Sequence, residues 1–387
     1  MRVLFAGSPE IAVPTLRALA RAHQVVGVLT NPESAQGRGQ AVKPTAVELA
    51  ARELWGPAFP ILRPVTLRTA ARAEVAALKP DILVSFAYGK IFGPKFLELF
   101  PKGGINVHPS LLPRYRGSSP IQQAILDMVS ETGVCVQTIA LEMDTGDILC
   151  VERIPLTGRE TSATLSVIAA EIGAKLALQA LEAISQGKEQ PVPQQGEPSY
   201  CQKISKSDGL VDWQFSSVRI DARVRAFNPW PLAYTYFHGQ RLNILESYPF
   251  AASVGKDLQD TTQDMQEKRQ GMQDPPARSH LDPPAQSQMG PPARSHSDPP
   301  AQSQMGPPAR SHLDPPAQSY SDPQSALWNP VPGAIIGIDR HKGIVVQTGD
   351  GVLGLLVLQL AGRKALPFAE FANGARNLVG TVLSSRA

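Results

Sequence analysis

The stretch RVLFAGSPEIAVPTLRALARAHQVVGVLT (residues 2–30) decides the fold, because it joins two apolar runs through one amphipathic segment. Residues 2–7 and 24–30 are rich in Val and Leu and have the length of buried strands, whereas Pro9 to Arg21 repeats its apolar residues at helical spacing. A strand, a helix and a second strand in this order form a βαβ unit with two parallel strands. Continuous apolar strands of this kind are buried on both faces of a sheet.

The same alternation continues through the first half of the chain. Further apolar runs stand at 59–62 (FPIL) and 81–87 (DILVSFA), and helical patterns begin near Pro44 and Leu67. We therefore predict an α/β, Rossmann-like, open and mainly parallel sheet with helices on both faces. In such sheets ligands bind beyond the carboxyl ends of the strands. The loop after the first strand has no G-x-G-x-x-G spacing, so no dinucleotide fingerprint is present.

The length and composition of the chain exclude several classes of protein. A chain of 387 residues exceeds one ordinary core, so two domains plus additional material are expected. The three cysteines are far apart and odd in number, which predicts neither a disulfide framework nor a metal site and suits a reducing compartment. Pro9 interrupts the amino-terminal apolar run too early for a signal peptide, and no run approaches the roughly 18 residues of a membrane span. We expect a cytoplasmic monomer with no metal and no membrane partner.

A different pattern fills the carboxy-terminal half, where short alternating runs are separated by turns. This spacing favours a small β-barrel as a second domain. A predicted helix from Thr161 to Ser185 and a Pro/Gln-rich stretch precede it. We therefore predict a first, catalytic domain at 1–187, a linker at 188–200 and a barrel domain at 201–387.

An internal repeat interrupts the barrel pattern. Units of eight residues, alternately PPARSH and PPAQS in their constant part, begin at Pro275, Pro283, Pro291, Pro299, Pro307 and Pro315. Each unit has two prolines and at most one large apolar side chain, which is too little to offset the entropy of ordering it. We predict that 251–325 is a disordered, partly polyproline-II insertion, tolerated because long loops add little closure entropy. A peptide-binding role is the alternative, although the units match no P-x-x-P pattern cleanly.

Several chemical groups gather in the stretch GGINVHPSLLPRYRG (103–117). Residues two apart on a strand share a face, so Asn106 and His108 project together. Pro109 donates no ladder hydrogen bond and ends the strand, which leaves the imidazole at the carboxyl edge of the sheet. A histidine that only caps a strand is the alternative.

A third candidate group lies in the turn of LEMDTGDIL (141–149) between two predicted strands. An Asp in such a turn usually stabilises its own backbone. Turn chemistry alone does not separate Asp144 from Asp147 as the functional carboxylate.

The polar segment between Thr30 and Pro44 is too long for a plain connection and carries Arg38 between two glycines, with Lys43 behind it. It is either a mobile surface loop or a basic finger that touches a phosphate-bearing substrate. The net charge of +3 is unevenly distributed, and the carboxy-terminal part outside the repeat is modestly basic. That excess is compatible with a polyanionic partner.

Eight segments occur together in an order shared with one enzyme family. They are FAGSPEIAVPTL, GRG, SFAYGKI, INVHPSLLPRYRGSSPIQQAI, TGVCVQTIALEMDTGDIL, ISKSDGLVDW, VRAFNPWPLAY and TGDGVLGLLVLQLAGRK. With them the chain resembles the folate-dependent formyltransferase family along nearly its whole length outside the repeat. The N-x-H, S-L-L-P and D-x-x-D elements are common to enzymes of the family that act on glycinamide ribonucleotide and amino sugars. VRAFNPWP and an OB-like carboxy-terminal barrel resemble the tRNA-formylating branch more closely.

This resemblance implies transfer of the formyl group of 10-formyltetrahydrofolate to the α-amino group of methionine on initiator methionyl-tRNA, for translation initiation. It implies Asn106, His108 and Asp144 as the catalytic residues. The chemistry agrees, because an amine that attacks a formamide-like carbon generates a tetrahedral oxyanion, and the Asn106 amide and a protonated His108 are suitable donors to it. Asp144 would orient or polarise His108 and help to move the ammonium proton.

By the same resemblance, two loops line the folate and scattered cations contact the tRNA backbone. The folate wall would comprise Ser110, Leu111, Leu112 and Pro113 together with Phe86, Ala87, Tyr88 and Gly89. The tRNA contacts would be Arg38, Lys43, Lys203, Lys206, Arg223, Arg225, Arg363 and Lys364. The apolar residues are alternatively ordinary core, and each cation is alternatively a solvated surface charge. Phosphate contacts of this kind are sensitive to salt and largely indifferent to sequence.

Two other functions remain open at this point. An enzyme with the same chemistry on an amino sugar or a nucleotide amine predicts transfer to a small amine and indifference to truncation of the barrel. A hydrolase, or a catalytically idle tRNA-binding protein, predicts release of formate or binding without transfer.

Overall fold

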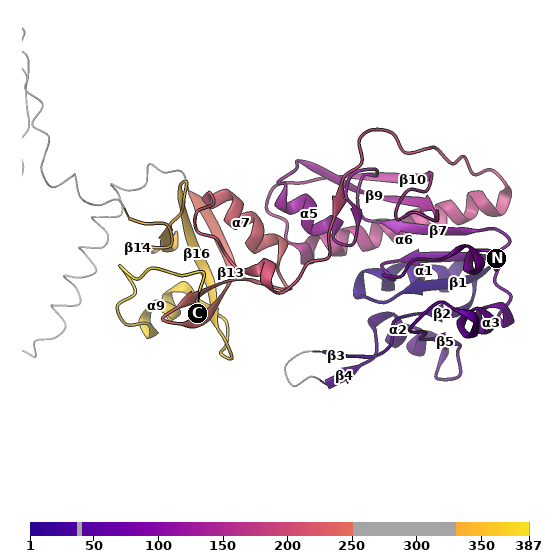
Figure 1. Cartoon of the computed structure of the whole chain (residues 1–387), viewed down its shortest axis with the longest axis horizontal. Coiled ribbons are helices and arrows are strands. Elements are labelled where there is room, and N and C mark those ends of the chain that lie inside the picture. Colours follow the sequence, from indigo (N-terminus) through magenta and orange to yellow (C-terminus); the bar gives the residue numbers. More distant parts are fainter. Residues whose placement is uncertain (37–40, 251–329, 387) are drawn as a thin grey trace, which may run out of the picture. The chain divides into compact units, whose positions relative to one another are not determined.

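The computed structural model describes residues 1–36, 41–250 and 330–386 (Figure 1). The chain divides into a unit of Met1–Thr261 with Val331–Ala387 and a unit of Thr262–Pro330, and all described residues except Pro330 belong to the first. The predicted repeat insertion at 251–325 and Arg38 lie outside the described residues. Among the helices of the described ranges, none is both long and apolar enough to cross a membrane.

Seven strands form the amino-terminal sheet, in the order β10-β9-β7-β6-β1-β2-β5 (Figure 1). The strands from β7 to β5 run parallel, and β9 and β10 are antiparallel at one edge. The predicted open, mainly parallel sheet is therefore confirmed. The strands are β1 Arg2–Gly7, β2 Gln24–Leu29, β5 Ile61–Leu62, β6 Ile82–Phe86, β7 Gly104–His108, β9 Glu131–Thr138 and β10 Ile148–Pro155.

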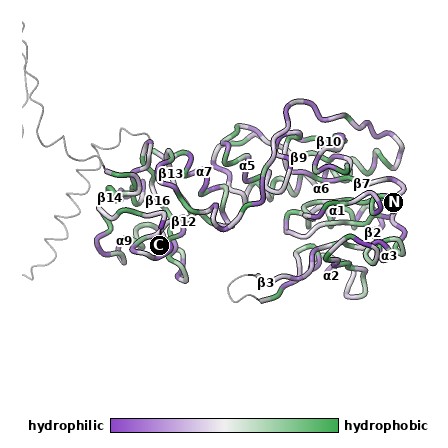
Figure 2. The backbone as a smooth tube through the Cα atoms, viewed as in Figure 1, coloured by the Kyte–Doolittle hydropathy of each residue, from purple (hydrophilic) through white to green (hydrophobic). Residues whose placement is uncertain are grey.

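Both faces of this sheet are covered, because successive residues of a buried strand point to opposite sides. Val3 and Phe5 of β1 join a core with α1, α2, α5 and α6, whereas Leu4 and Ala6 join a second core that includes α3 and α4. Hydrophobic residues are frequent along α6 (Figure 2). The helices are α1 Val13–Ala22, α2 Ala46–Trp55, α3 Thr69–Ala77, α4 Pro94–Leu97, α5 Pro120–Leu126 and α6 Ser162–Gln186.

The polar segment after β2 contains two short antiparallel strands, β3 Ser34–Gln36 and β4 Ala41–Lys43. At its base, Asn31 Nδ2 donates to Ser8 Oγ at 2.9 Å and to the Tyr88 carbonyl at 2.8 Å. These bonds fix the base of the segment to the loops that follow β1 and β6. The segment is therefore attached to the carboxyl edge of the sheet, and Lys43 is exposed at its end.

The carboxy-terminal part forms an antiparallel sheet in the order β12-β13-β16-β15-β14, with β17 beside β16. The chain end closes this sheet, because Ser384 bridges Tyr236 of β12 and Val382 bridges Ala334 beside β14. Both edges thus hydrogen-bond to the same segment, which agrees with the predicted small barrel. The elements are α7 Ser217–Ala226, β12 Ala233–Phe237, β13 Gln240–Phe250, β14 Ile335–Asp339, β15 Gly343–Gln347, β16 Val352–Leu360, β17 Leu366–Pro367 and α9 Phe368–Gly374.

A buried carboxylate attaches α2 to the edge of the amino-terminal sheet. The Glu48 side chain is fully buried and accepts hydrogen bonds from Arg63 Nε at 2.6 Å and Nη2 at 2.5 Å, while Arg52 pairs with it at 2.6 Å. The hydrogen bond from Arg63 is the main reason that the pKa of Glu48 lies below its ordinary value, against the opposing effect of burial. Arg63 directly follows β5, so this pair joins a helix to a strand.

We predict that Glu48→Gln lowers the free energy of unfolding by about 2 kcal/mol at neutral pH, since hydrogen bonds to charged groups contribute about 1.5–3 kcal/mol. The folded pKa of Glu48 lies below the unfolded one. The stabilisation is therefore complete above the unfolded pKa and is lost as the pH falls through the folded pKa. Urea denaturation of wild type and variant at neutral and acid pH measures this.

Glu53→Gln is the matched control, because Glu53 lies on α2 like Glu48 but forms an exposed ion pair, with Arg17 of α1. It should change the stability little at either pH. A loss in Glu48→Gln that persists unchanged into acid would contradict the assignment.

Candidate active site

A pocket of about 560 Å³ lies at the carboxyl edge of β6 and β7. Its lining includes residues 86–89 after β6, Asn106 and His108 at the end of β7, and Asp144 from the loop between β9 and β10. Pro9, two residues after the end of β1, also contributes. In the sheet, β1 lies between β2 and β6, so the strand order reverses its direction at β1. Open α/β sheets bind ligands beyond the carboxyl ends of the strands at such a reversal, and the pocket lies there.

The pairing of β7 with β9 brings one further side chain to this edge. Asn106 lies opposite Gln137, and His108 lies opposite Cys135. Gln137 and His108 are both buried. Gln137 was not among the predicted site residues, because the sequence did not indicate an antiparallel partner for β7; once the register is known, its position beside Asn106 follows.

The carboxylate of Asp144 is the meeting point of these groups. Its Oδ1 lies 3.6 Å from His108 Nδ1 and accepts hydrogen bonds from Gln137 Nε2 at 3.1 Å and from Asn106 Nδ2 at 3.4 Å. Its Oδ2 accepts a hydrogen bond from the Gly117 backbone N–H at 2.8 Å. The three predicted catalytic side chains, from two separate segments of the chain, therefore lie together.

The turn that carries Asp144 has an unusual backbone. Asp144 adopts a left-handed φ of +56°, which is uncommon for a residue with a side chain and requires support from its surroundings. A Cβ atom on Gly146 would lie 1.7 Å from the Thr138 carbonyl oxygen, so this close approach requires glycine. Asp147 closes the turn, because its carbonyl accepts a hydrogen bond from the Thr138 N–H at 2.9 Å and its own N–H donates to Thr138 Oγ1 at 3.0 Å. The structure therefore separates the two acidic candidates, with Asp144 in the pocket and Asp147 in the turn.

The orientation of the His108 ring follows from its second contact. Nε2 lies 2.9 Å from the Tyr115 carbonyl oxygen, which only accepts hydrogen bonds. In the neutral ring the hydrogen is therefore on Nε2, and Nδ1 faces Asp144. A second proton adds to Nδ1, on the side of the carboxylate.

The segment that was predicted as a linker contacts this site. Two short strands, β8 Arg116–Gly117 and β11 Tyr200–Cys201, pair in parallel. Ser199 Oγ accepts a hydrogen bond from the Tyr115 backbone N–H at 2.9 Å. Gln194 lies farther back in the same segment and reaches the turn of Asp144. The Pro/Gln-rich composition of this segment gave no indication of such contacts.

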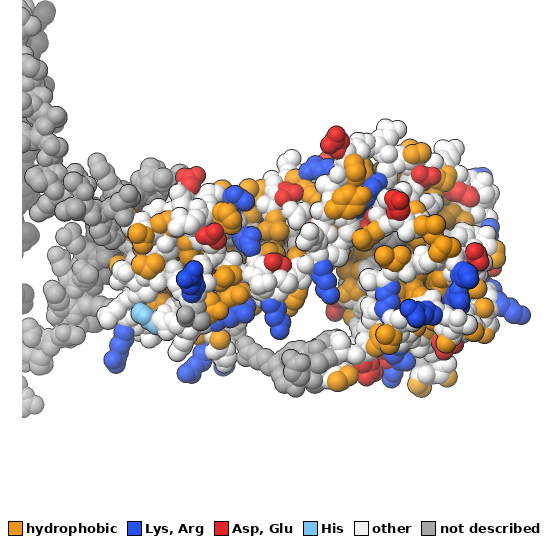
Figure 3. Space-filling model, viewed as in Figure 1, with side chains coloured by type: hydrophobic (Ala, Val, Ile, Leu, Met, Phe, Trp, Pro, Cys, Tyr) orange, Lys and Arg blue, Asp and Glu red, His pale blue; other side chains and the backbone are white. Residues whose placement is uncertain are grey.

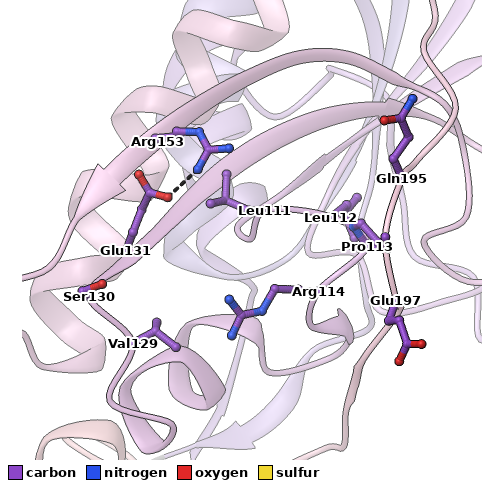
Figure 4. A pocket seen from close by; sticks show the side chains of 11 residues that line it. Leu111, Leu112, Pro113, Arg114, Val129, Ser130, Glu131, Arg153, Gln195 and Glu197 are labelled. Carbon is purple, nitrogen blue, oxygen red and sulfur yellow. Dashed lines mark hydrogen bonds and ion pairs between the residues drawn. The ribbon is translucent and has the colours of Figure 1, made fainter.

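The two predicted folate walls are in different places. Residues 86–89 line the pocket with the three catalytic candidates, but Leu111, Leu112 and Pro113 line a separate hollow of about 540 Å³ (Figure 4). Ser110 is fully buried, and its Oγ donates to the Arg114 carbonyl at 2.6 Å.

The backbone explains why residues 111–113 line this second hollow. The chain turns sharply after His108, whose carbonyl accepts a hydrogen bond from the Ser110 N–H at 2.9 Å. Leu111 then covers Gly133 of β9, where a Cβ atom would lie 2.4 Å from Leu111 Cδ2. The loop is thus directed away from the pocket, to a hollow that also contains the ion pair of Arg153 and Glu131 (Figure 4).

The predicted tRNA contacts also divide into two groups. Five of them are exposed, namely Lys43, Lys203, Lys206, Arg363 and Lys364. Arg225 forms a 2.7 Å ion pair with the buried Asp221, and its Nη1 donates to the Glu160 carbonyl at 3.2 Å. Arg223 lies over the Phe227 ring, and burial lowers its pKa. These two arginines of α7 therefore make contacts within the fold, unlike the five exposed cations.

Known proteins resemble this chain in both sequence and fold. Residues 1–181 match the family model of formyl transferase, and residues 203–270 and 311–376 match that of the formyl transferase C-terminal domain. A methionyl-tRNA formyltransferase of Treponema pallidum is 38% identical over 97% of this chain and 96% of its own length. This chain belongs to the formyltransferase family. A second member, the methionyl-tRNA formyltransferase of Borreliella burgdorferi, is 32% identical over 100% of this chain and 99% of its own.

Two solved structures share the formyltransferase fold at low sequence identity. HypX from Aquifex aeolicus, in complex with tetrahydrofolic acid, has a TM-score of 0.53 and 15% identity; the match covers 98% of this chain and 48% of HypX, so the chain spans about half the length of that protein. The N-formyltransferase from Helicobacter canadensis, in complex with folinic acid and dTDP-3-aminofucose, has a TM-score of 0.50 and 21% identity. That match covers 65% of this chain and 88% of the other.

We predict that neutral His108 carries its hydrogen on Nε2, because Nε2 faces a carbonyl oxygen at 2.9 Å. Long-range ¹H–¹⁵N spectra of ¹⁵N-histidine protein, recorded as a function of pH, distinguish the two ring nitrogens. Nδ1 should show the shift of an unprotonated nitrogen at high pH and should change most on acidification. The exposed His341 is the internal reference for a ring without this constraint. A neutral ring protonated on Nδ1 would contradict the geometry.

Proposed function

We propose that this formyltransferase transfers the formyl group of 10-formyltetrahydrofolate to the α-amino group of methionine on initiator methionyl-tRNA. The observation that carries the chemistry is the convergence of Asn106, His108 and Asp144 at one pocket. The acceptor follows from relatives named methionyl-tRNA formyltransferase, which match this chain across nearly their whole length.

The three side chains have complementary tasks in this reaction. When the amine adds to the formyl carbon, negative charge develops on the formyl oxygen, and fixed hydrogen-bond donors stabilise it. Asn106 has an amide N–H for this purpose. The imidazolium form of His108 supplies a second donor through Nδ1–H, because Nε2–H is bonded to the Tyr115 carbonyl, whereas Nδ1 lies 3.6 Å from Asp144, beyond hydrogen-bond distance. Asp144 faces His108 Nδ1 at 3.6 Å, so it stabilises the charged ring and receives the proton that the attacking ammonium group must lose.

The pocket fits a folate. Its volume of about 560 Å³ is within the range of small-molecule sites, roughly 300–1,000 Å³. Exposed Ile91, Leu141 and Met143 contribute apolar surface to its lining, on which a flat ring packs. The Tyr88 side chain also borders the pocket, and its buried hydroxyl has no hydrogen-bond partner among the described residues.

The acceptor RNA requires cations outside the pocket. We assign catalysis to a domain at 1–187, joined by the linker at 188–200 to a tRNA-binding barrel domain at 201–387. On the face in Figure 3, Lys and Arg side chains are more frequent than Asp and Glu over the part that the barrel forms. Exposed Arg363 and Lys364 follow β16 and are suited to phosphate contacts. The proposal further holds that the enzyme acts as a cytoplasmic monomer.

We predict that Asn106→Ala leaves a folded protein whose kcat is about 10²- to 10³-fold lower, the usual cost of one oxyanion donor. The assay combines purified protein, 10-formyltetrahydrofolate and charged initiator methionyl-tRNA, and it measures formylmethionyl-tRNA. Asn373→Ala, an exposed asparagine of α9, is the matched control and should keep wild-type activity.

The acceptor is tested in the same assay by comparing initiator tRNA with elongator methionyl-tRNA and with small amines such as an amino sugar nucleotide. Preferential formylation of the small amine would replace the proposed acceptor. Release of formate without transfer would indicate a hydrolase.

We predict that replacing Arg363 and Lys364 by Ala weakens tRNA binding and lowers the slope of log K against log salt by about 1 for each phosphate that is no longer neutralised. Fluorescence anisotropy with labelled initiator tRNA across a salt series measures the slope. Arg340→Ala removes an exposed charge from the turn between β14 and β15 and is the control. An unchanged slope in the double variant would exclude these two cations as phosphate ligands.

A further inference from the structure

Gln194 belongs to the Pro/Gln-rich segment that precedes the barrel, yet its amide group lies within the network of the active site. Its Nε2 lies 2.8 Å from the Asp144 carbonyl oxygen, 2.8 Å from the Gly146 carbonyl oxygen and 3.2 Å from Gln137 Oε1. The side chain is half-buried, whereas those of Pro193 and Gln195 on either side are exposed.

The orientation of this amide is determined by Arg116. Gln194 Oε1 accepts hydrogen bonds from Arg116 Nη2 at 2.7 Å and from Nε at 3.1 Å. A guanidinium group only donates, so the oxygen of the amide must face Arg116 and the nitrogen must face the carbonyls. Arg116 is itself held by a hydrogen bond from Nη1 to the Tyr200 hydroxyl at 3.2 Å.

The two carbonyl acceptors belong to the turn in which Asp144 adopts its left-handed conformation. A single donor group that bonds both carbonyls resists the rotation of the intervening peptide units. It therefore restrains the backbone that directs the Asp144 side chain toward His108.

The third contact of Gln194 controls a neighbouring amide. Because Gln137 Oε1 faces the Gln194 N–H group, Gln137 Nε2 must point the other way, to Asp144 Oδ1 at 3.1 Å. The series Arg116, Gln194, Gln137 and Asp144 is thus a chain of donors in one direction, in which each bond polarises the next.

We infer that Gln194 is a positioning residue for Asp144, so that the interdomain segment is part of the catalytic apparatus. This inference rests on the proposed formyl transfer. Gln194 donates hydrogen bonds to two carbonyls of the Asp144 turn and orients the Gln137 amide. Both effects keep the Asp144 carboxylate beside His108 Nδ1. Its removal affects the rate of the chemical step more than the binding of either substrate.

Two substitutions of Gln194 distinguish its effect on the position of Asp144 from its effect on the attachment of the segment 188–200 to Arg116. Gln194→Met keeps the length but neither donates nor accepts. Gln194→Glu keeps an acceptor for Arg116 but lacks the N–H donors, so it retains the docking and loses the contacts to the Asp144 turn. Gln195→Met, at an exposed neighbouring position, is the matched control.

We expect kcat for formylmethionyl-tRNA to fall by about tenfold to 10²-fold in both Gln194 variants, because small displacements of catalytic groups have effects of this size. KM for both substrates should stay within about twofold of wild type, and the pH profile of kcat should shift, since the carboxylate no longer stays beside His108. Gln195→Met should match wild type. Limited proteolysis should cleave residues 188–199 faster in Gln194→Met but not in Gln194→Glu.

A wild-type kcat in Gln194→Glu would overturn the inference, and so would variants that lose only thermal stability or only raise KM. A crystal structure of Gln194→Glu gives a measure that does not depend on folding of the Met variant or on activity. An Asp144 carboxylate that stays at 3.6 Å from His108 Nδ1 there would also overturn it. Wild-type protein that makes no formylmethionyl-tRNA would overturn the proposed function together with the inference, whereas active wild type with unaffected Gln194 variants would overturn the inference alone.

Discussion

The carboxylate of Asp144 is the point on which the site depends, because it accepts hydrogen bonds from three groups and faces a fourth. A left-handed backbone costs a residue with a side chain about 1–3 kcal/mol, so Asp144 keeps this position only if its surroundings hold it. The close approach of Gly146 to Thr138 and the backbone bonds of Asp147 supply part of that support. Much of the nearby structure therefore serves to hold the Asp144 carboxylate in place.

The same reasoning applies to the imidazole. His108 is fixed through Nε2 by the Tyr115 carbonyl, and Tyr115 has a left-handed φ of +61°. The Tyr115 backbone N–H donates to Ser199 Oγ, in the segment of residues 188–200. Nδ1 is therefore directed at Asp144 by contacts that come from a distant part of the chain. A site that holds its groups in advance needs less reorganisation during the reaction.

The chemical centre and the choice of acceptor are physically separate. Asn106, His108 and Asp144 lie at one pocket, and in the proposed reaction they act on the formyl group and the attacking amine rather than on the rest of the acceptor. Three side chains at a sheet edge do not distinguish an amino sugar from an aminoacyl-tRNA. In the proposed function that distinction falls to surfaces outside the pocket, among which the barrel and the segment with Lys43 carry exposed cations. The fold thus keeps a fixed reaction centre beside separate substrate-binding surfaces.

Sequence alone determined the features that depend on local spacing. The spacing of apolar residues and the composition of the runs predicted the parallel strands. The two-residue spacing put Asn106 and His108 on the same face of their strand, and Pro109 ended that strand at the carboxyl edge. The tertiary structure decided every contact that depends on pairing between distant segments. It placed Asp144 rather than Asp147 in the pocket lining, put Gln137 opposite Asn106, directed Leu111 to a separate hollow and brought Gln194 to the turn. Local rules fix which way a side chain points along its own element, whereas register and long-range packing decide which group it meets.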